Sequence, residues 1–216
     1  MGGSGIGSLI PAAYMPLFFI VAGYLLGSLP FAIIVTRLFG MADPRSYGSG
    51  NPGATNVLRS GNKLAAILTL LGDAVKGWLA VWLAQHFGAS GAEAVTSTTI
   101  AAVGFAALLG HVFPIFIGFK GGKGVATAAG VFLGFSGTLA LVCIGVWLAV
   151  AVITRYSSLA AICAALAAPL FALWLLDMPQ AVALAGMSVL VIWRHQQNIR
   201  NLLAGTEGRI GKKKAA

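Results

Sequence analysis

The sequence predicts an all-α protein that crosses a membrane several times. Of its 216 residues, 58% are hydrophobic and only 9% are charged, and the mean hydropathy is +0.91. A soluble domain is about a quarter charged, so a water-soluble fold of this composition would lack polar residues for its surface. The apolar residues also gather in long runs, as membrane-spanning helices of about 20 residues require. We expect one integral-membrane domain over residues 1–216, with flexible ends at 1–9 and 210–216.

Seven apolar segments make up the expected polytopic bundle of transmembrane helices. The first contains Pro30, and lipid-embedded helices tolerate a proline kink because neighbouring groups satisfy the freed backbone. The fourth is short, since Ser136 and Gly137 follow it closely, and we expect it to be a half-length helix packed inside the bundle. The segments are residues 14–39, 64–87, 95–116, 124–135, 138–153, 159–176 and 180–193.

The cationic side chains predict the orientation of the bundle. With seven crossings, one side of the membrane receives the amino terminus and the loops that hold Glu93 and Asp177, without Lys or Arg. Because Lys and Arg accumulate in cytoplasmic loops, we expect the amino terminus outside and the carboxyl terminus in the cytoplasm. The cytoplasmic side receives Arg45, Arg59, Lys63, Lys120, Lys123, Arg155, Arg194, Arg200, Arg209 and Lys212 to Lys214. A nucleic-acid binder could carry the net charge of +9, but not with this hydropathy, so we expect no nucleic-acid partner.

The first polar cluster is the loop 47–59, between the first two segments. Ser49, Thr55 and Asn56 offer hydroxyl and amide groups, and Arg59 offers a forked cation that suits phosphate oxygens. The small residues that allow a ligand to approach the backbone include Gly50, Asn51 and Gly53. An ordinary turn followed by a helix N-cap gives the same pattern, so this loop alone leaves both interpretations open.

The second polar cluster runs from Gly110 to Phe116 and on into the loop 119–125, the glycine-lysine loop, where Lys120 and Lys123 lie among glycines. Glycine lets the backbone turn its N–H groups toward a ligand, and a helix starting at Gly124 would add its positive end. This favours a phosphate site at the membrane surface, with Gly121 and Gly122 in the turn. The residue order excludes a Walker A loop. Lysines at this membrane edge also serve as topology signals or contacts to lipid headgroups.

The third polar cluster lies at the end of the last segment. His195 and Asn198 are three residues apart and would share a helix face, with Glu207 further on. His195 could act as a general base or accept a hydrogen bond from a hydroxyl nucleophile. An interfacial His and Asn at a helix end explain the pattern equally well.

A buried charge pair is predicted inside the second segment, where Asp73 and Lys76 have helical spacing. Charges within a bilayer usually pair or face a polar interior, so we expect mutual neutralisation, with support of an active-site floor as a second role. His111 on an apolar helix end is more often structural than catalytic. Cys143 and Cys163 lie in apolar runs and are expected to be buried thiols, and no pattern indicates a metal or an organic cofactor.

Together the three clusters resemble the membrane glycerol-3-phosphate acyltransferases that use acyl phosphate as donor, the PlsY family. Residues 48–56 are similar to that family's Gly-Ser-Gly-Asn-Pro-Gly-Ala-Thr-Asn loop, and residues 110–127 to its Gly-His-x-Phe-Pro motif with the following Lys-Gly-Gly-Lys-Gly-Val-Ala-Thr. Residues 194–207 are similar to its Arg-His-x-x-Asn-Ile motif with a trailing Gly-x-Glu. One departure is that Arg200 directly follows the isoleucine, whereas the family often has a basic residue two positions after it.

The resemblance implies seven helices in the bacterial inner membrane, the amino terminus outside and an active site that faces the cytoplasm. It implies that acyl phosphate and sn-glycerol 3-phosphate react to give 1-acylglycerol 3-phosphate (lysophosphatidic acid) and phosphate, the first acylation step of bacterial phospholipid synthesis. Membrane lipids are the expected surroundings. We expect neither a cofactor nor an acyl-enzyme, and a chain able to work as a monomer.

On this basis we expect two sets of site residues. His195 and Asn198 would orient the glycerol hydroxyls, and the proton acceptor is either His195 or the substrate phosphate. We favour the phosphate, whose second pKa is about 6, because no residues form a nucleophile, base and orienter set. The expected catalytic residues are Ser49, Arg59, Lys120, His195 and Asn198. The expected substrate-binding residues, several of them holding the acyl phosphate head, are Gly50, Asn51, Gly53, Thr55, Asn56, Gly121, Gly122, Lys123, Gly124 and Glu207.

Two other classes of protein share part of this pattern. A small anion transporter would have similar cationic loops and apolar helices, but transporters tend to show internal repeats and helices broken at the membrane midplane. Here the polar clusters gather on one face and no repeat is visible. A lipid-binding structural protein would explain the charge but not the ordered Ser, Asn, His and Lys residues.

Overall fold

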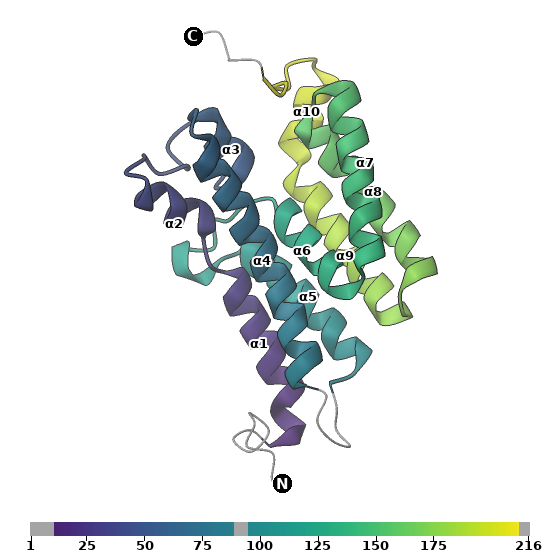
Figure 1. The fold of residues 1–216 in the computed structure, drawn as a ribbon. Helices are drawn as coiled ribbons and strands as arrows, with labels where there is room; N and C mark the ends of the chain where they lie inside the picture. The colour runs from purple at the N-terminus through teal and green to yellow at the C-terminus, as the bar shows by residue number, and fades with distance from the viewer. Residues whose placement is uncertain (1–10, 89–94, 212–216) are drawn as a thin grey trace.

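The computed structural model describes residues 11–88 and 95–211, which form a bundle of helices with no strand in either range (Figure 1). Two short 3-10 helices, η2 (Ala12–Tyr14) and η3 (Ile115–Ile117), precede α1 and follow α5. The α-helices of these ranges are α1 (Met15–Gly27), α2 (Phe31–Leu38), α3 (Ala54–Arg59), α4 (Lys63–Phe87), α5 (Ser97–Val112), α6 (Val125–Phe135), α7 (Gly137–Thr154), α8 (Ser157–Leu175), α9 (Met178–Arg194) and α10 (Gln196–Leu203).

Each predicted apolar segment is helical in the structure, which confirms the all-α fold. Four helices of the described ranges are long and apolar enough to cross a membrane, namely α4, α7, α8 and α5 with its extension through η3. The bent pair of α1 and α2 passes the same test as one span. The remaining apolar helices are shorter: α9 has 17 residues, and α6, the short fourth segment, has 11.

The predicted first segment is divided by a bend of 41° between α1 and α2. Pro30 has no N–H group and disfavours helical geometry at the residue before it, so α1 ends before it, at Gly27, and α2 begins at Phe31. The Leu29 carbonyl at the bend accepts a hydrogen bond of 2.8 Å from Nζ of Lys76 on α4. The bend therefore turns α2 away from the axis of α1, while a side chain of α4 satisfies the exposed backbone.

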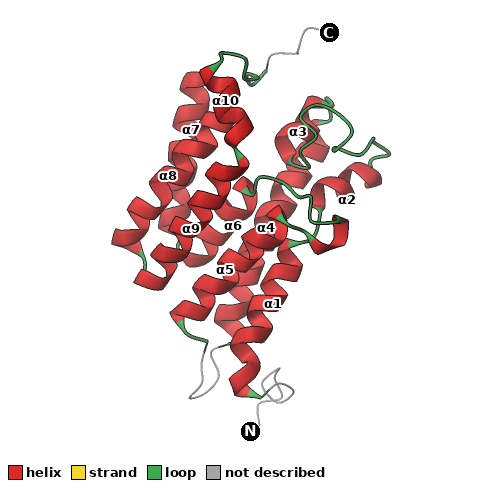
Figure 2. Cartoon of the chain, turned by 180° about the vertical axis from the view of Figure 1, so that it is seen from behind, coloured by secondary structure: helices red, strands yellow, loops and turns green. Residues whose placement is uncertain are grey.

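Glycines allow the closest helix contacts in the bundle. On α1, a Cβ atom at Gly27 would lie 2.0 Å from the backbone oxygen of Ala107 on α5. On α6, a Cβ atom at Gly130 would lie 1.8 Å from the backbone oxygen of Ala74 on α4. Figure 2 shows α1 beside α5 and α4 beside α6. Small residues let these backbones approach, as is typical of helix interfaces in membranes.

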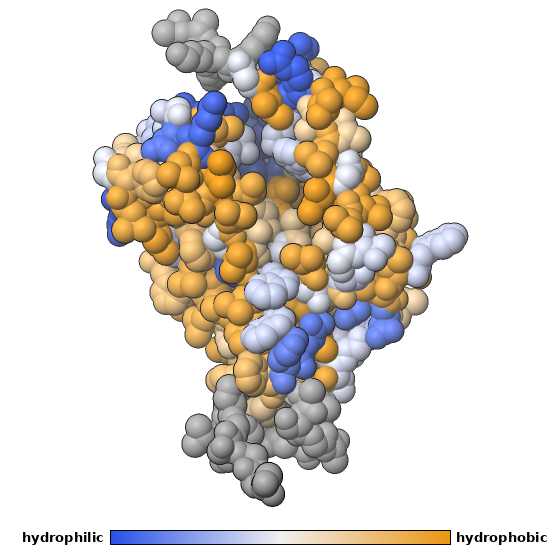
Figure 3. Space-filling model, in the orientation of Figure 1, coloured by the Kyte–Doolittle hydropathy of each residue, from blue (hydrophilic) through white to orange (hydrophobic). Residues whose placement is uncertain are grey.

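The outer surface of the bundle is apolar around its middle. Large side chains such as Leu141, Val152 and Trp174 are more than 70% exposed, which suits contact with lipid chains rather than water. Figure 3 shows this hydrophobic surface and, near one end, a hollow between the side formed by α3 and α4 and the side formed by α7 and α10. Hydrophilic residues lie at the depth of the hollow.

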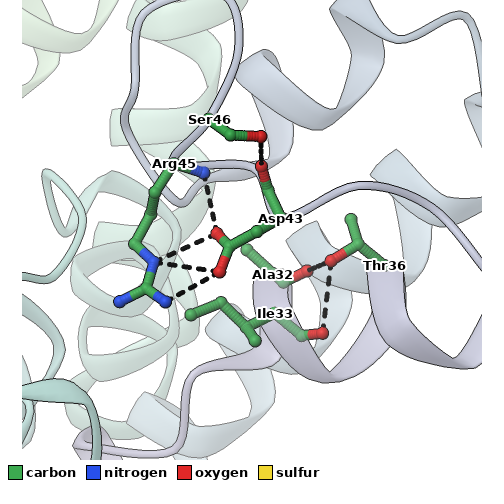
Figure 4. Close-up of polar contacts among 6 residues, drawn as sticks. All are labelled: Ala32, Ile33, Thr36, Asp43, Arg45 and Ser46. Carbon is green, nitrogen blue, oxygen red and sulfur yellow. Dashed lines mark hydrogen bonds and ion pairs between the residues drawn. The ribbon is translucent and has the colours of Figure 1, made fainter.

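Local polar contacts hold the loop between α2 and α3. The guanidinium of Arg45 donates to both carboxylate oxygens of Asp43, with Nη2 and Oδ2 2.7 Å apart (Figure 4). These hydrogen bonds lower the pKa of Asp43. The Ser46 hydroxyl donates to the Asp43 carbonyl at 2.7 Å. Arg45 is thus paired within its own loop.

Some predicted features lie outside the described residues, namely Glu93, Lys212 to Lys214, the expected flexible end 1–9 and residues 212–216 of the expected flexible end 210–216. Ile210 is described, and it exchanges two hydrogen bonds with Arg155. Its N–H donates to the Arg155 carbonyl at 2.7 Å, and Nη2 of Arg155 donates to the Ile210 carbonyl at 2.9 Å. The segment after α10 is therefore tied to the loop between α7 and α8.

Candidate active site

The structure brings the second and third polar clusters into direct contact. Nζ of Lys123 donates a hydrogen bond to Oδ1 of Asn198. The guanidinium of Arg194 donates to the carbonyls of Gly121 at 2.9 Å and Gly122 at 3.2 Å. The end of α9 and the start of α10 therefore hold the glycine-lysine loop from one side.

The first cluster meets the other two from the opposite side. The Pro52 carbonyl lies 3.2 Å from the place that a Cβ atom would take on Gly122. Nη2 of Arg59, at the end of α3, lies 3.4 Å from the corresponding position on Gly208, beyond α10. Because α3 and α10 stand on opposite sides of the hollow (Figure 1), Arg59 reaches across it. All three clusters therefore contribute to one site.

Asn56 organises the first cluster from within. Its side chain is buried, and Oδ1 accepts the N–H of Ser49 at 2.9 Å. Its amide nitrogen donates to the carbonyls of Pro44 at 2.6 Å and Tyr47 at 3.1 Å. Both amide hydrogens are used inside the loop, so Asn56 shapes the loop and positions Ser49 rather than offering a donor to a ligand.

The turn of the second cluster is built against the end of α5. The N–H of Gly121 donates to the Val112 carbonyl at 3.1 Å, and the N–H of Gly122 donates to the His111 carbonyl at 3.2 Å. A Cβ atom on Gly122 would lie 2.2 Å from Nε2 of His111. These two N–H groups, which the sequence suggested as phosphate donors, are thus already hydrogen-bonded within the protein. The N-terminal end of α6 offers other backbone N–H groups to a phosphate, since no side chain of the described residues caps this helix after Gly124.

A buried charged group lies beneath this turn. Nζ of Lys76 is 2.7 Å from Oδ1 of Asp73, as the spacing predicted, and both side chains are less than 5% exposed. Nδ1 of His111 is 3.5 Å from the same carboxylate oxygen. The three side chains line a small cavity together with Gly121 and Gly122. The pair therefore supports the floor of the site.

His195 sits in the turn between α9 and α10, with its ring buried. Nδ1 lies 2.8 Å from the Val191 carbonyl. A carbonyl can only accept, so Nδ1 carries the proton and Nε2 has a free lone pair. Burial, with the nearby cations Lys123 and Arg194, lowers the pKa of His195 to about 4, against the opposing effects of the Val191 hydrogen bond and of Glu207. The neutral ring can therefore accept a hydrogen bond from a hydroxyl group.

A chain of hydrogen bonds leads from Lys123 to α8. Nδ2 of Asn198 donates to Oε1 of Glu207 at 2.7 Å, and the Ser158 hydroxyl donates to the same oxygen at 2.7 Å. Asn201 donates to the other carboxylate oxygen at 3.3 Å. Burial, with the charges of Arg59 and Arg194, lowers the pKa of Lys123 to about 8, against the opposing effect of Glu207. Glu207 thus fixes Asn198, and Asn198 fixes Lys123.

The other predicted site residues lie in α3, in the loop before it and in the loop after η3. Ser49 and Thr55 are exposed in and beside the first loop, and Lys120 is exposed two residues beyond Gly118. Gly50 is exposed and Asn51 and Gly53 are partly buried in the same loop. Among the described residues, no three His, Cys, Asp or Glu side chains are placed to hold a metal ion.

Two residues of this network were not identified from the sequence as site residues. Arg194 looked like a topology charge, although its position next to His195 was a usable signal. Ser158 lies in an apolar segment, and no sequence signal marks it. Its role depends on the fold of the segment after α10, where Arg209 also donates to the Tyr156 hydroxyl at 3.0 Å.

The family model described as glycerol-3-phosphate acyltransferase matches residues 17–205. A glycerol-3-phosphate acyltransferase of Laribacter hongkongensis is 59% identical over 195 residues, which cover 90% of this chain and 96% of the relative. One of Paraburkholderia phymatum is 59% identical over 197 residues, covering 91% and 93%.

Solved structures give the same result. The glycerol 3-phosphate form of PlsY, an integral membrane glycerol 3-phosphate acyltransferase, is 39% identical with a TM-score of 0.83, covering 91% of this chain and 96% of that one. Its lysophosphatidic acid form is 38% identical with a TM-score of 0.82, covering 91% and 95%. This chain is therefore an integral-membrane member of the glycerol-3-phosphate acyltransferase family.

Proposed function

We propose that the protein transfers the acyl group of an acyl phosphate to sn-glycerol 3-phosphate, giving 1-acylglycerol 3-phosphate and inorganic phosphate. The observation that carries the proposal is the junction of Lys123, Asn198 and Arg59 beside a neutral His195, in a hollow of an apolar bundle. Both substrates carry phosphate and the donor carries a long apolar chain, so the site needs cations and access to lipid. The similar PlsY structures are forms with glycerol 3-phosphate and lysophosphatidic acid, the acceptor and the product of this reaction.

The acceptor binds at the mouth of the hollow. Arg59, which reaches across it, and the exposed Ser49 and Lys120 hold the phosphate of glycerol 3-phosphate. The free Nε2 of His195 accepts a hydrogen bond from the attacking hydroxyl, and Asn198 holds the neighbouring groups. This arrangement supplies the positioning that turns a reaction between two bound molecules into an effectively intramolecular one.

The donor head binds deeper, at Lys123 and the start of α6. The Lys123 ammonium, the Thr55 hydroxyl and the N–H groups at the N-terminal end of α6 hold its phosphate, and the positive helix end favours an anion there. The same donors stabilise the negative charge that develops on the carbonyl oxygen during attack. Gly121 and Gly122 contribute by their small size, which allows close approach.

The acyl group passes directly from the donor to the acceptor. The glycerol hydroxyl oxygen attacks the carbonyl carbon, the bond between that carbon and the phosphate oxygen breaks, and phosphate leaves. The hydroxyl proton passes to a substrate phosphate oxygen, whose second pKa is about 6. Because the pKa of His195 is about 4, its ring is a poor proton acceptor at neutral pH and serves to orient the hydroxyl. No acyl-enzyme forms.

We also propose that the chain spans the bacterial inner membrane seven times, with the amino terminus outside and the site facing the cytoplasm. The basic residues of the loops on the site's side support this orientation. A cysteine placed at Asp177 should then react with a membrane-impermeant maleimide on intact cells, and one placed at Arg155 should not. The reverse labelling would contradict the orientation.

The test of the reaction is an assay of the purified protein with palmitoyl phosphate and labelled sn-glycerol 3-phosphate, with palmitoyl-CoA as the control donor. We expect lysophosphatidic acid from palmitoyl phosphate and none from palmitoyl-CoA. Equal product from palmitoyl-CoA would contradict the assignment of acyl phosphate as the specific donor. No product from either, in protein shown to be folded, would overturn the reaction and favour uptake of phosphate compounds, which proteoliposomes would reveal.

A further inference from the structure

A second cavity lies outside the site described above. It has a volume of about 470 Å³ and lies between α2 and η3, where the bend before α2 turns that helix away from α1. In Figure 1, η3 is the teal segment below α2. This cavity, called the groove below, is lined by Ile33, Ile34, Leu38, Phe116 and Ile117, with Arg37 and Pro30 at its two ends.

The groove has polarity along its length. Pro30, Ile33 or Ile34, and Arg37 follow each other at intervals of three and four residues, so they lie on one face of α2. Arg37 is in the last turn of α2 and exposed, next to the polar loop 40–53, whereas Pro30 is at the end nearer to the bundle. A cation at one end and apolar walls along the rest match an anionic amphiphile, with its head at Arg37 and its chain toward Pro30.

The groove also adjoins the candidate active site. Pro30 and Ile117 line both this groove and the small inner cavity, whose wall includes Gly121 and Gly122. Lys120 follows Ile117 by three residues. The loop from η3 runs from the side of α2 to the start of α6 (Figure 2), so it links the groove to the donor site.

We propose that the groove between α2 and η3 is a loading site for the long-chain acyl phosphate, with the phosphate at Arg37 and the chain on Ile33, Ile34 and Phe116. The inference rests on the proposed function. A donor that reaches the protein through the bilayer binds here first, because the cation lies at the polar end and the remaining walls are apolar. Its head then passes along the loop 118–124 to Lys123.

Kinetics with two donors test this site. Arg37→Gln removes the cation, and Ile34→Trp fills the groove at an exposed position. Arg37→Gln should raise the KM for palmitoyl phosphate roughly fivefold, the effect of one cation near a membrane surface, and Ile34→Trp should raise it by blocking the groove. Both variants should leave unchanged kcat, the KM for glycerol 3-phosphate and the rate with acetyl phosphate, which has no long chain. Matched controls are Arg45→Gln, whose guanidinium is bound to Asp43, and Ile67→Trp, an exposed isoleucine of α4 outside the groove.

The outcomes separate this inference from the proposed function. An inactive wild-type protein contradicts the proposed function itself. An active wild type with unchanged KM for palmitoyl phosphate in both variants, or equal changes with acetyl phosphate, overturns the loading site.

A binding probe distinguishes the donor from a lipid. Hexadecyl phosphate with a diazirine in its chain should label peptides that contain Ile34 or Phe116. Palmitoyl phosphate should compete with this labelling, and phosphatidylglycerol should not. Equal competition by phosphatidylglycerol would make the groove a phospholipid site and overturn its assignment to the donor.

Discussion

At the scale of single residues, the hydrogen bond from His195 to the Val191 carbonyl is decisive for the mechanism. It fixes the proton on Nδ1 and leaves Nε2 as an acceptor, while burial lowers the pKa of the ring to about 4. If His195 only orients the hydroxyl, a glutamine that offers an amide oxygen can replace part of its role. We expect His195→Ala to reduce kcat roughly a hundredfold or more and His195→Gln to recover at least a tenth of wild-type kcat. Equal inactivity of two folded variants would instead indicate a general base.

The lowered pKa of Lys123 predicts that activity falls at alkaline pH. Its pKa is lowered to about 8, so it is mostly cationic at pH 7 and loses its charge as the pH rises through about 8. In the proposed site the cationic form binds the donor phosphate, and therefore kcat/KM should fall above pH 8. In Lys123→Arg the limit should move upward, because the guanidinium stays charged. A pH profile that is the same in wild type and Lys123→Arg would exclude Lys123 as the titrating group.

Substitution of Ser158 should lower activity although its hydroxyl donates to Glu207 rather than to Lys123 or Asn198. Without its hydroxyl, Glu207 keeps only its bonds to Asn198 and Asn201, and its hold on Asn198 weakens. We expect Ser158→Ala to lower kcat/KM roughly tenfold, as for a hydrogen bond to a charged group. Ser158→Thr keeps the hydroxyl and should restore most of the loss at an unchanged unfolding temperature. If Ser158→Thr were as impaired as the alanine variant, its hydroxyl would not be the cause.

At the scale of elements, α6 depends on close contact with α4. A side chain at Gly130 would meet the backbone oxygen of Ala74, which cannot move aside as a flexible side chain could. Gly130→Ala should therefore destabilise the protein by about 1–3 kcal/mol, measured by thermal unfolding in detergent. Gly145→Ala on α7 is the control, because nothing lies within 4 Å of its Cβ position. A stability loss of the same size in both variants would contradict this account of α6.

The elements also show what sequence patterns can and cannot supply. The seven apolar segments, including the short α6, were predictable because hydrophobic runs are local features. The bounds of α3 and α10 were not predicted, since both lie in polar stretches where no apolar run marks them, and α10 was anticipated only as the helix face shared by His195 and Asn198. The kink at Pro30 was expected, but not that Lys76 would donate to the carbonyl exposed there, because that contact joins two distant parts of the chain.

The same distinction applies to the candidate site. Three motifs pointed to one site because their residue types suit phosphate, and the pairing of Asp73 with Lys76 followed from helical spacing. The partners of individual groups were not predictable. The amide of Asn56 and the N–H groups of Gly121 and Gly122 looked free in the sequence, yet each donates within the protein. Ser158 became visible only when the fold placed it beside Glu207.

At the scale of the whole molecule, the short α6 explains why a polar site lies in an apolar bundle. Its 11 residues extend about 16 Å at 1.5 Å per residue, half of a hydrocarbon core of about 30 Å. The loop before α6 therefore lies below the ends of the longer helices around it, and the hollow of Figure 3 lies above it. In the proposed function, this depth would let the phosphate of the acceptor and the acyl chain of the donor meet at Lys123.

The most direct test of this account measures lysophosphatidic acid and released phosphate together, in vesicles that hold either the wild-type protein or a folded His195→Ala or Lys120→Ala variant. With palmitoyl phosphate and sn-glycerol 3-phosphate, the wild type should form both products in equal amounts, and both variants should lose most of this activity. Wild-type protein without product, or variants that turn over at the wild-type rate, would contradict acyl transfer at this site.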